Sequence, residues 1–161
     1  MSSSYGKPLL FDNSVWARLL DGRLAGPQRE AFEMALVANE LWSCPPTLLE
    51  MRYSARDSDG FAITAKRLDA LPHAPLTGEA AATALTAQAE LAATPGISHR
   101  VKPVDLLIAS IAATEELGVL HYDHDYDIIA EHTSLSFPSV WVAPRGDIGR
   151  STQAPKGSQI Q

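Results

Sequence analysis

The sequence predicts an α/β domain of three layers, in which a mainly parallel central sheet lies between two layers of helices. Two observations favour this fold class. Short apolar runs of strand length alternate with longer segments of helical periodicity over most of the chain, and no segment repeats. A length of 161 residues also suits one domain with one core. We expect this domain to span residues 1–143. A flexible tail over residues 144–161 is expected from its Pro, Gly, Ser, Gln and charged residues.

The first half of the chain begins with PLLFD at residues 8–12, which has the length and apolarity of a buried strand. Asn13 or Ser14 can cap the helix that follows it. The elements expected next are a helix at 27–41, a short strand at 42–46 (WSCPP), and helices at 47–56 and 61–71. The polar residues 57–60 are predicted to break the chain between the last two helices.

The second half of the chain contains two strongly helical segments. Residues 79–93 are rich in alanine, the best helix former. Pro103 suits the first turn of a helix over residues 103–117, which Gly118 is expected to stop. The remaining elements are expected to be a strand at 119–122, a short helix at 125–133 and a last strand at 138–142.

Composition limits the compartment and the partners of the protein. The net charge is −6, which counts against tight, nonspecific DNA binding because such binding usually needs a basic surface. The one cysteine, Cys44, excludes an internal disulfide and favours a reducing compartment. The first residues, MSSSYGKP, lack the pattern of a signal peptide, and no apolar run has the length of a membrane span. We therefore expect a cytoplasmic protein.

Four carboxylates stand where an apolar run meets the start of a helix. They are Asp12 in PLLFD, Glu50 in PPTLLE, Asp105 in KPVDLLIASIA and Asp123 in VLHYDHD. In a parallel α/β sheet, every strand-to-helix junction lies at the same edge, so these distant acids can meet there. Crowded carboxylates repel one another unless a cation holds them. Oxygen ligands without paired Cys or His favour Mg²⁺ or Mn²⁺, which can activate water for phosphodiester hydrolysis.

Each acid also has an ordinary structural explanation. Thr47-x-x-Glu50 has the spacing of a capping box. Asp105 falls in a first helical turn, where a negative charge is favourable, and Asp125 could cap the helix that it begins. Convergence explains the set better, because the helix after Asp105 is apolar on most sides and is predicted to be buried. An acid at the mouth of such a helix faces a crevice.

In these motifs the chain resembles the PIN-domain ribonucleases and, within them, the VapC-type toxins of bacterial toxin–antitoxin pairs. The resemblance spans residues 9–142, and its most specific parts are KPVDLLIASIAA and LHYDHDYDIIAEHT. It implies a three-layer PIN-like domain that uses Mg²⁺ or Mn²⁺ to cleave single-stranded or loop RNA. It also implies an antitoxin partner and a homodimer. The implied catalytic and metal-binding residues are Asp12, Glu50, Asp105 and Asp123, with Asp125 as a fifth candidate metal ligand.

Other polar residues near the acids could act on the substrate or on the metal. Ser14, Arg100 and Lys102 are the candidate phosphate ligands. His121 stands where many relatives carry Thr or Ser, which is the main departure from the family pattern. A metal bound by Asp123 and the flanking His121 and His124 is a less favoured alternative, because no spaced set of Cys and His accompanies them. We expect His121 at the surface or packed at an edge.

Two other functions stay open. Asp123-x-Asp125 after an apolar strand could supply the nucleophile and acid of a phosphatase that forms an aspartyl-phosphate, although no companion lysine motif is evident. A catalytically inactive PIN-like module could also bind RNA or protein without cleaving. The presence of all four acids counts against this second alternative.

Overall fold

The computed structural model of the protein describes residues 5–148. Within them, four strands form one sheet in the spatial order β2-β1-β3-β4. The strands are β1 (Leu9–Phe11), β2 (Leu41–Trp42), β3 (Gly118–His121) and β4 (Ser139–Trp141), and every pairing between them is parallel. The parallel sheet predicted from the alternation of strands and helices is confirmed.

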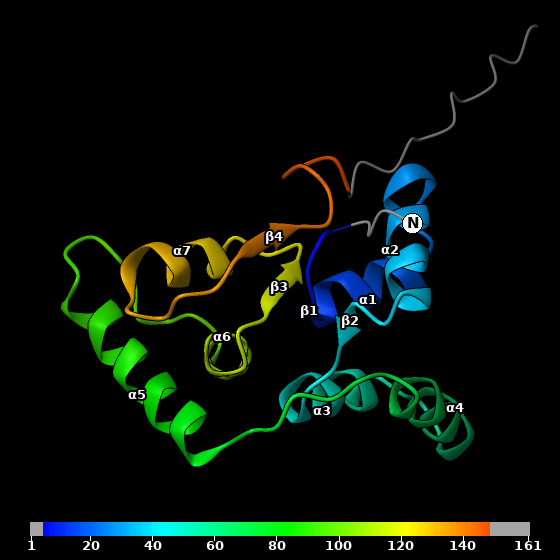
Figure 1. Ribbon diagram of the computed structural model, residues 1–161, viewed down its shortest axis with the longest axis horizontal. Helices are drawn as coiled ribbons and strands as arrows, with labels where there is room; N and C mark the ends of the chain where they lie inside the picture. Colours follow the sequence, from blue (N-terminus) through cyan, green and yellow to red (C-terminus); the bar gives the residue numbers. More distant parts are fainter. Residues whose placement is uncertain (1–4, 149–161) are drawn as a thin grey trace, which may run out of the picture.

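Seven helices accompany this sheet in the described part of the chain (Figure 1). They are α1 (Asn13–Leu20), α2 (Gly26–Val37), α3 (Pro45–Tyr53), α4 (Ser58–Asp69), α5 (Gly78–Ala93), α6 (Pro103–Thr114) and α7 (Asp125–His132). In Figure 1, α1 and α2 lie on one side of the strands and α5, α6 and α7 on the other, which is the predicted three-layer arrangement. None of these helices is both long and apolar enough to cross a membrane.

Residues of the central strand β1 alternate between two hydrophobic cores, as the two-residue period of a strand requires. Leu9 and Phe11 pack with α1 and α2 in one core, and Leu10 packs with α5, α6 and α7 in the other. All three side chains are fully buried. Helix α6 is buried over most of its length, as its apolar sequence predicts. The sheet and α6 therefore form the rigid frame that carries the site.

Helix α2 ends earlier than its sequence indicates. It stops at Val37 because Asn39 takes a left-handed backbone conformation with φ of 56°. The N–H of Glu40 then donates back to the carbonyl of Ala35, which closes the helix end. Leu41, which we expected at the end of this helix, is instead the first residue of β2.

Helix α6 also ends early, for the same physical reason. It stops at Thr114, and Glu116 takes φ of 56° while the N–H of Leu117 donates to the carbonyl of Ala112. The prediction that Gly118 stops the helix is therefore wrong, because Gly118 is the first residue of β3. The glycine is needed there for a different reason, which is the close approach of the neighbouring strands.

Four helix starts differ from those read from the sequence. Asp12, and not Asn13 or Ser14, caps α1. Helix α3 begins at Pro45 within the predicted strand 42–46, so Thr47 lies inside the helix and makes no capping box with Glu50. Residues 57–60 are not the predicted non-helical break, because they form the cap and first turn of α4. His124 precedes α7, so Asp125 is its first residue and not its cap.

The predicted C-terminal tail lies mostly outside the described residues. Its first five residues are described, and three of them contact Tyr122, whose hydroxyl donates to the carbonyl of Pro144 at 3.5 Å. The backbone N–H groups of Gly146 and Ile148 each donate to the Tyr122 hydroxyl at 2.9 Å. Residues 144–148 are thereby connected to the segment that follows β3.

The close packing around Gly118 generates a stability prediction. A Cβ at this position would overlap Cδ2 of Leu9 and lie 3.1 Å from the carbonyl oxygen of Pro138. We expect Gly118→Ala to lower the free energy of unfolding by about 1–3 kcal/mol, measured by urea denaturation. Gly78→Ala is the control, because a Cβ there meets nothing within 4 Å. Equal stability of the two variants would contradict the proposed packing.

Candidate active site

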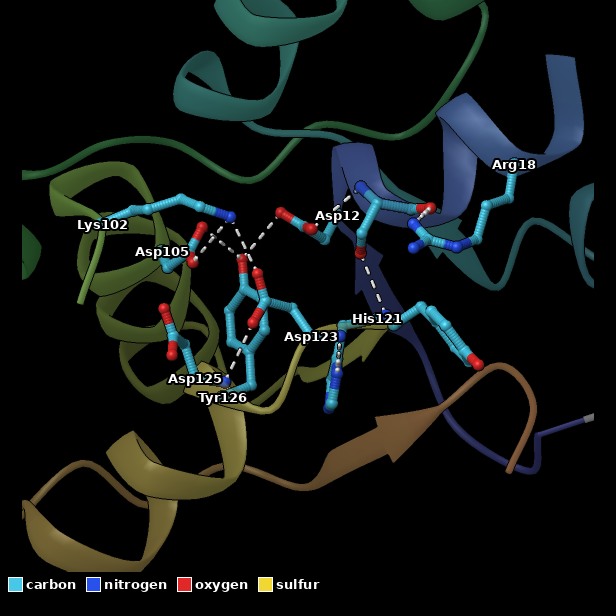
Figure 2. Close-up of polar contacts among 10 residues, drawn as sticks. Asp12, Arg18, Lys102, Asp105, His121, Asp123, Asp125 and Tyr126 are labelled. Carbon is cyan, nitrogen blue, oxygen red and sulfur yellow. Dashed lines mark hydrogen bonds and ion pairs between the residues drawn. The ribbon is translucent and has the colours of Figure 1, made fainter. Parts of the chain in front are cut away.

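The predicted site residues gather where the parallel strands end, around a cavity of about 300 Å³. Six of them line this cavity: Asp12, Ser14, Glu50, Lys102, Asp105 and Asp123. Figure 2 shows the labelled acids pointing toward one another from the end of β1, the start of α6 and the segment after β3. Acids that are more than 100 positions apart in the sequence therefore share one crevice.

Tyr126 joins two of the acids. The carboxylate of Asp12 accepts the N–H of Ser14 through Oδ2 at 2.9 Å and the hydroxyl of Tyr126 through Oδ1 at 2.8 Å. The same hydroxyl lies 3.4 Å from Oδ1 of Asp105. Tyr126 is fully buried in the first turn of α7. The hydroxyl of Tyr126, on α7, thus contacts both the acid that follows β1 and the acid in the first turn of α6.

Asp105 is the acid most isolated from water, with an exposed fraction of 2%. Its Oδ2 is buried without a hydrogen-bond partner, and its nearest cation, the ammonium of Lys102, is 4.0 Å away. Burial, and then the negative charge of Asp12, raises the pKa of Asp105 to about 8. Buried polar atoms are normally satisfied, so this carboxylate oxygen is available to a ligand from outside the chain.

Three carboxylates have the spacing of a cation site. Oxygens of Asp105, Asp123 and Asp125 all lie within 4.8 Å of one another. Asp123 accepts the N–H of Asp125 at 3.0 Å and the ammonium of Lys102 at 2.8 Å. A set of oxygen ligands that includes one unpartnered atom fits Mg²⁺ or Mn²⁺.

The pKa values of this group differ because the neighbours differ. Burial acts to raise the pKa of Asp123, but the hydrogen bonds from Lys102 and from the N–H of Asp125 lower it below its ordinary value. Burial, and then the charge of Asp123, raises the pKa of Asp125. The hydrogen bond to Asp123 raises the pKa of Lys102, so its ammonium stays charged.

Glu50 also lines the cavity and belongs to α3. Its side chain is half-buried. Burial, and then the charge of Asp12, raises its pKa above the ordinary value. Glu50 lies outside the three-acid group, so its part in metal binding stays a prediction.

The structure overturns the expected position of His121. The side chain is fully buried and not at the surface or an edge. Its Nδ1 accepts the N–H of Asp123 at 3.1 Å, so Nε2 carries the proton and donates to Oγ of Ser139 at 2.7 Å. Burial lowers the pKa of His121 to about 4, so the ring is neutral at pH 7. His121 thus positions the backbone of Asp123, and both of its nitrogens are engaged.

Two predicted phosphate ligands take different places. The hydroxyl of Ser14 accepts the N–H of Tyr122 at 3.0 Å and connects α1 to the segment after β3. Arg100 lies in an exposed loop before α6 and does not line the cavity. Their binding to phosphate stays a prediction.

Two residues of the site escaped the sequence analysis. Arg18 lines the cavity, donates to the carbonyl of Ser14 at 2.8 Å and lies 4.4 Å from the ring centre of Tyr122. Its position four residues after Ser14, on the same face of α1, was the available signal. Tyr126 could have been noticed as a phenol directly after Asp125 at a helix start, but nothing in the sequence pairs it with Asp12.

Comparison with known proteins assigns the family. Residues 9–132 match the PIN domain. The chain is 37% identical over 115 residues to Ribonuclease VapC18 of Mycobacterium tuberculosis, a match that covers 71% of this chain and 82% of that protein. It is 34% identical over 139 residues to Ribonuclease VapC51 of the same organism, covering 86% and 96%. The protein therefore belongs to the PIN-domain family, and the resemblance to its VapC-type members is confirmed.

Solved structures with the same fold come from toxin–antitoxin complexes. DNA-bound VapBC from Salmonella typhimurium matches with a TM-score of 0.66 at 19% identity, covering 85% of this chain and 99% of that chain. VapBC-5 from Mycobacterium tuberculosis matches with a TM-score of 0.56 at 23% identity, covering 83% and 98%. At these identities the likeness establishes the fold.

The burial of Asp105 predicts a pH dependence of stability in metal-free buffer. The unfolded chain ionises this carboxyl near its ordinary pKa of about 4, whereas the folded protein retains the proton up to about 8. The folded state binds more protons over this interval, so this group makes stability fall as the pH rises from about 4 to about 8. At pH 8, Asp105→Asn should exceed the wild type in free energy of unfolding by more than about 1 kcal/mol. Urea denaturation with a chelator measures this difference, which should shrink toward pH 4; a constant difference would contradict the assignment.

The bridging hydroxyl of Tyr126 predicts a second effect on stability. Tyr126→Phe keeps the buried ring but removes the proton that Asp12 accepts. A buried carboxylate oxygen then lacks its donor, so we expect the free energy of unfolding to fall by about 1–3 kcal/mol. Tyr53→Phe, at a side chain that is 92% exposed, is the matched control. Similar urea midpoints for both variants would argue against the bridge.

Proposed function

We propose that the protein is a metal-dependent endoribonuclease that cleaves single-stranded or loop RNA, and that it acts as the toxin of a toxin–antitoxin pair. The observation that carries this proposal is the buried Oδ2 of Asp105, which has no protein donor and belongs to a three-acid group. The PIN-domain family and two VapC ribonuclease relatives supply the class of reaction.

The acids supply the ligands that such a reaction needs. Asp105, Asp123 and Asp125 would hold Mg²⁺ or Mn²⁺, with Asp12 and Glu50 as further ligands. A divalent ion in such a site supplies a more acidic water and stabilises the leaving oxygen of a phosphodiester. The phosphatase alternative has less support, because the ammonium of Lys102 already engages Asp123 and would blunt its nucleophilicity.

Neighbouring residues keep these ligands in place. Tyr126 orients Asp12 and approaches Asp105 through one hydroxyl. His121 holds the backbone of Asp123 through its neutral ring. Because the ring carries no charge, it does not compete with the metal ion for the carboxylates. Ligands fixed in this way need little rearrangement when the ion binds, which favours both affinity and catalysis.

The cavity also carries the positive charge that an RNA backbone requires. Lys102 and Arg18 line it together with the acids, although the whole chain has a net charge of −6. Contact with RNA is therefore local. A single strand or a loop can bend one phosphate into a cavity of about 300 Å³, whereas a regular double helix is too wide and stiff to do so.

The same electrostatics suggest how a partner would inhibit the enzyme. An antitoxin with a basic segment would complement the acidic cavity and exclude RNA from it. The solved structures with this fold include toxin–antitoxin complexes, which supports such a partner. We extend the proposal to a homodimer and to action in the cytoplasm, where the RNA substrates and the antitoxin would be encountered.

The proposal predicts cleavage of a labelled single-stranded RNA by the purified protein in Mn²⁺. EDTA should stop the reaction and added Mn²⁺ should restore it, leaving 5′-phosphate and 3′-hydroxyl ends. Asp105→Asn should lower the rate on the order of 100-fold or more, because it removes a charged ligand at the centre of the site. Asp59→Asn, at an exposed acid in the first turn of α4, is the control and should cleave normally.

Two outcomes would change this conclusion. Cleavage that persists in EDTA would contradict metal dependence. Calorimetric Mn²⁺ binding by a protein that cleaves none of a broad pool of RNAs would favour the inactive, RNA- or protein-binding alternative.

A further inference from the structure

One cation of the chain already contacts the acid cluster, which is the group of Asp105, Asp123 and Asp125. The ammonium of Lys102 lies 2.8 Å from Oδ2 of Asp123 and 4.0 Å from Oδ2 of Asp105. Among the Lys and Arg residues of the described chain, it alone lies within 4.0 Å of a carboxylate of this cluster. Figure 2 shows its side chain extending from the start of α6 toward both acids.

The ammonium and a divalent ion would compete for the same carboxylates. Asp105 and Asp123 are two of the three acids whose oxygens lie within 4.8 Å of one another. An ion that binds these oxygens would stand a few ångströms from the ammonium, where two positive charges repel strongly in a partly buried site. Binding of both cations to Asp123 at once is therefore unfavourable.

Lys102 is built so that its charged end can move while its backbone stays fixed. Its side chain is 62% exposed, whereas that of Asp123 is 22% exposed and that of Asp105 is 3% exposed. The residue precedes Pro103, which restricts its backbone to an extended conformation. Four flexible methylenes therefore allow the ammonium to leave Asp123 and still remain at the cavity, which Lys102 lines.

We propose that Lys102 is the resident counter-ion of the acid cluster in the metal-free protein, and that its ammonium leaves Asp123 when the metal binds. The released ammonium then contacts a phosphate of the RNA in the same cavity. The first step concerns metal binding alone; the second step rests on the proposed ribonuclease function. In this scheme Lys102 lowers the affinity of the protein for the metal and raises its affinity for RNA.

The first step is tested by calorimetric titration of the whole protein with Mn²⁺ alone. Lys102→Met removes the competing charge but keeps a flexible side chain, so we expect Mn²⁺ to bind about tenfold more tightly, the equivalent of one charge-assisted hydrogen bond. Lys102→Arg retains the charge and should bind Mn²⁺ like the wild type. Lys66→Met, at an exposed position of α4, is the matched control. Unchanged or weaker Mn²⁺ binding by Lys102→Met would overturn the proposal.

The second step is tested by cleavage kinetics of a single-stranded RNA at saturating Mn²⁺. Lys102→Met should raise KM about tenfold with a smaller change in kcat, since one phosphate contact is lost. Lys102→Arg should restore most of the loss, and Lys66→Met should match the wild type. An unchanged KM for Lys102→Met would refute the phosphate contact. If no protein cleaves RNA, the proposed function fails, yet the Mn²⁺ titrations still decide the first step.

Discussion

The structure depends on the crowding of negative charge at one edge of a parallel sheet. Asp12 and Asp105 are 4% and 2% exposed, so water screens their repulsion only weakly. Two contacts offset it in the protein itself, the proton of Tyr126 and the ammonium of Lys102. Neither reaches Oδ2 of Asp105 within hydrogen-bond distance, so this buried atom has no hydrogen-bond partner among the described residues.

Helix α6 shows how one element serves both the core and the site. Most of its length packs against the sheet and against α5, and only its first turn carries an acid to the cavity. The N–H groups at a helix start have no partners within the helix, and their partial positive charge favours a carboxylate nearby. The buried Asp105 therefore has a partial compensation from its own helix. The apolar remainder of the helix holds this carboxylate in place.

The two cations at the cavity are held in different ways. Lys102 is paired with acids of the cluster. Arg18 has no ion pair in the described residues, because its guanidinium contacts a carbonyl and the ring of Tyr122. Within the described residues, the charge of Lys102 is thus partly offset by acids, whereas the charge of Arg18 is not. Under the proposed function, a bound metal and these two cations would attract an RNA phosphate even though the whole chain has a net charge of −6.

Local patterns in the sequence determined the class of fold, the order of the acids along the chain and the burial of α6. These features depend on strand and helix periodicity and on helix-start signals, which neighbouring residues set. The ends of α2 and α6 differ from the predicted ones because Asn39 and Glu116 take left-handed conformations. Asparagine favours this conformation, so Asn39 was an available signal, whereas the residue type of Glu116 gives none. Only the tertiary structure decided that Tyr126 donates to Asp12, 114 positions away, that His121 is buried, and that Arg100 lies outside the cavity while Arg18 lines it. Such contacts depend on the register of β1 against β3 and on how α6 and α7 pack against them, and no local pattern of residues specifies that geometry.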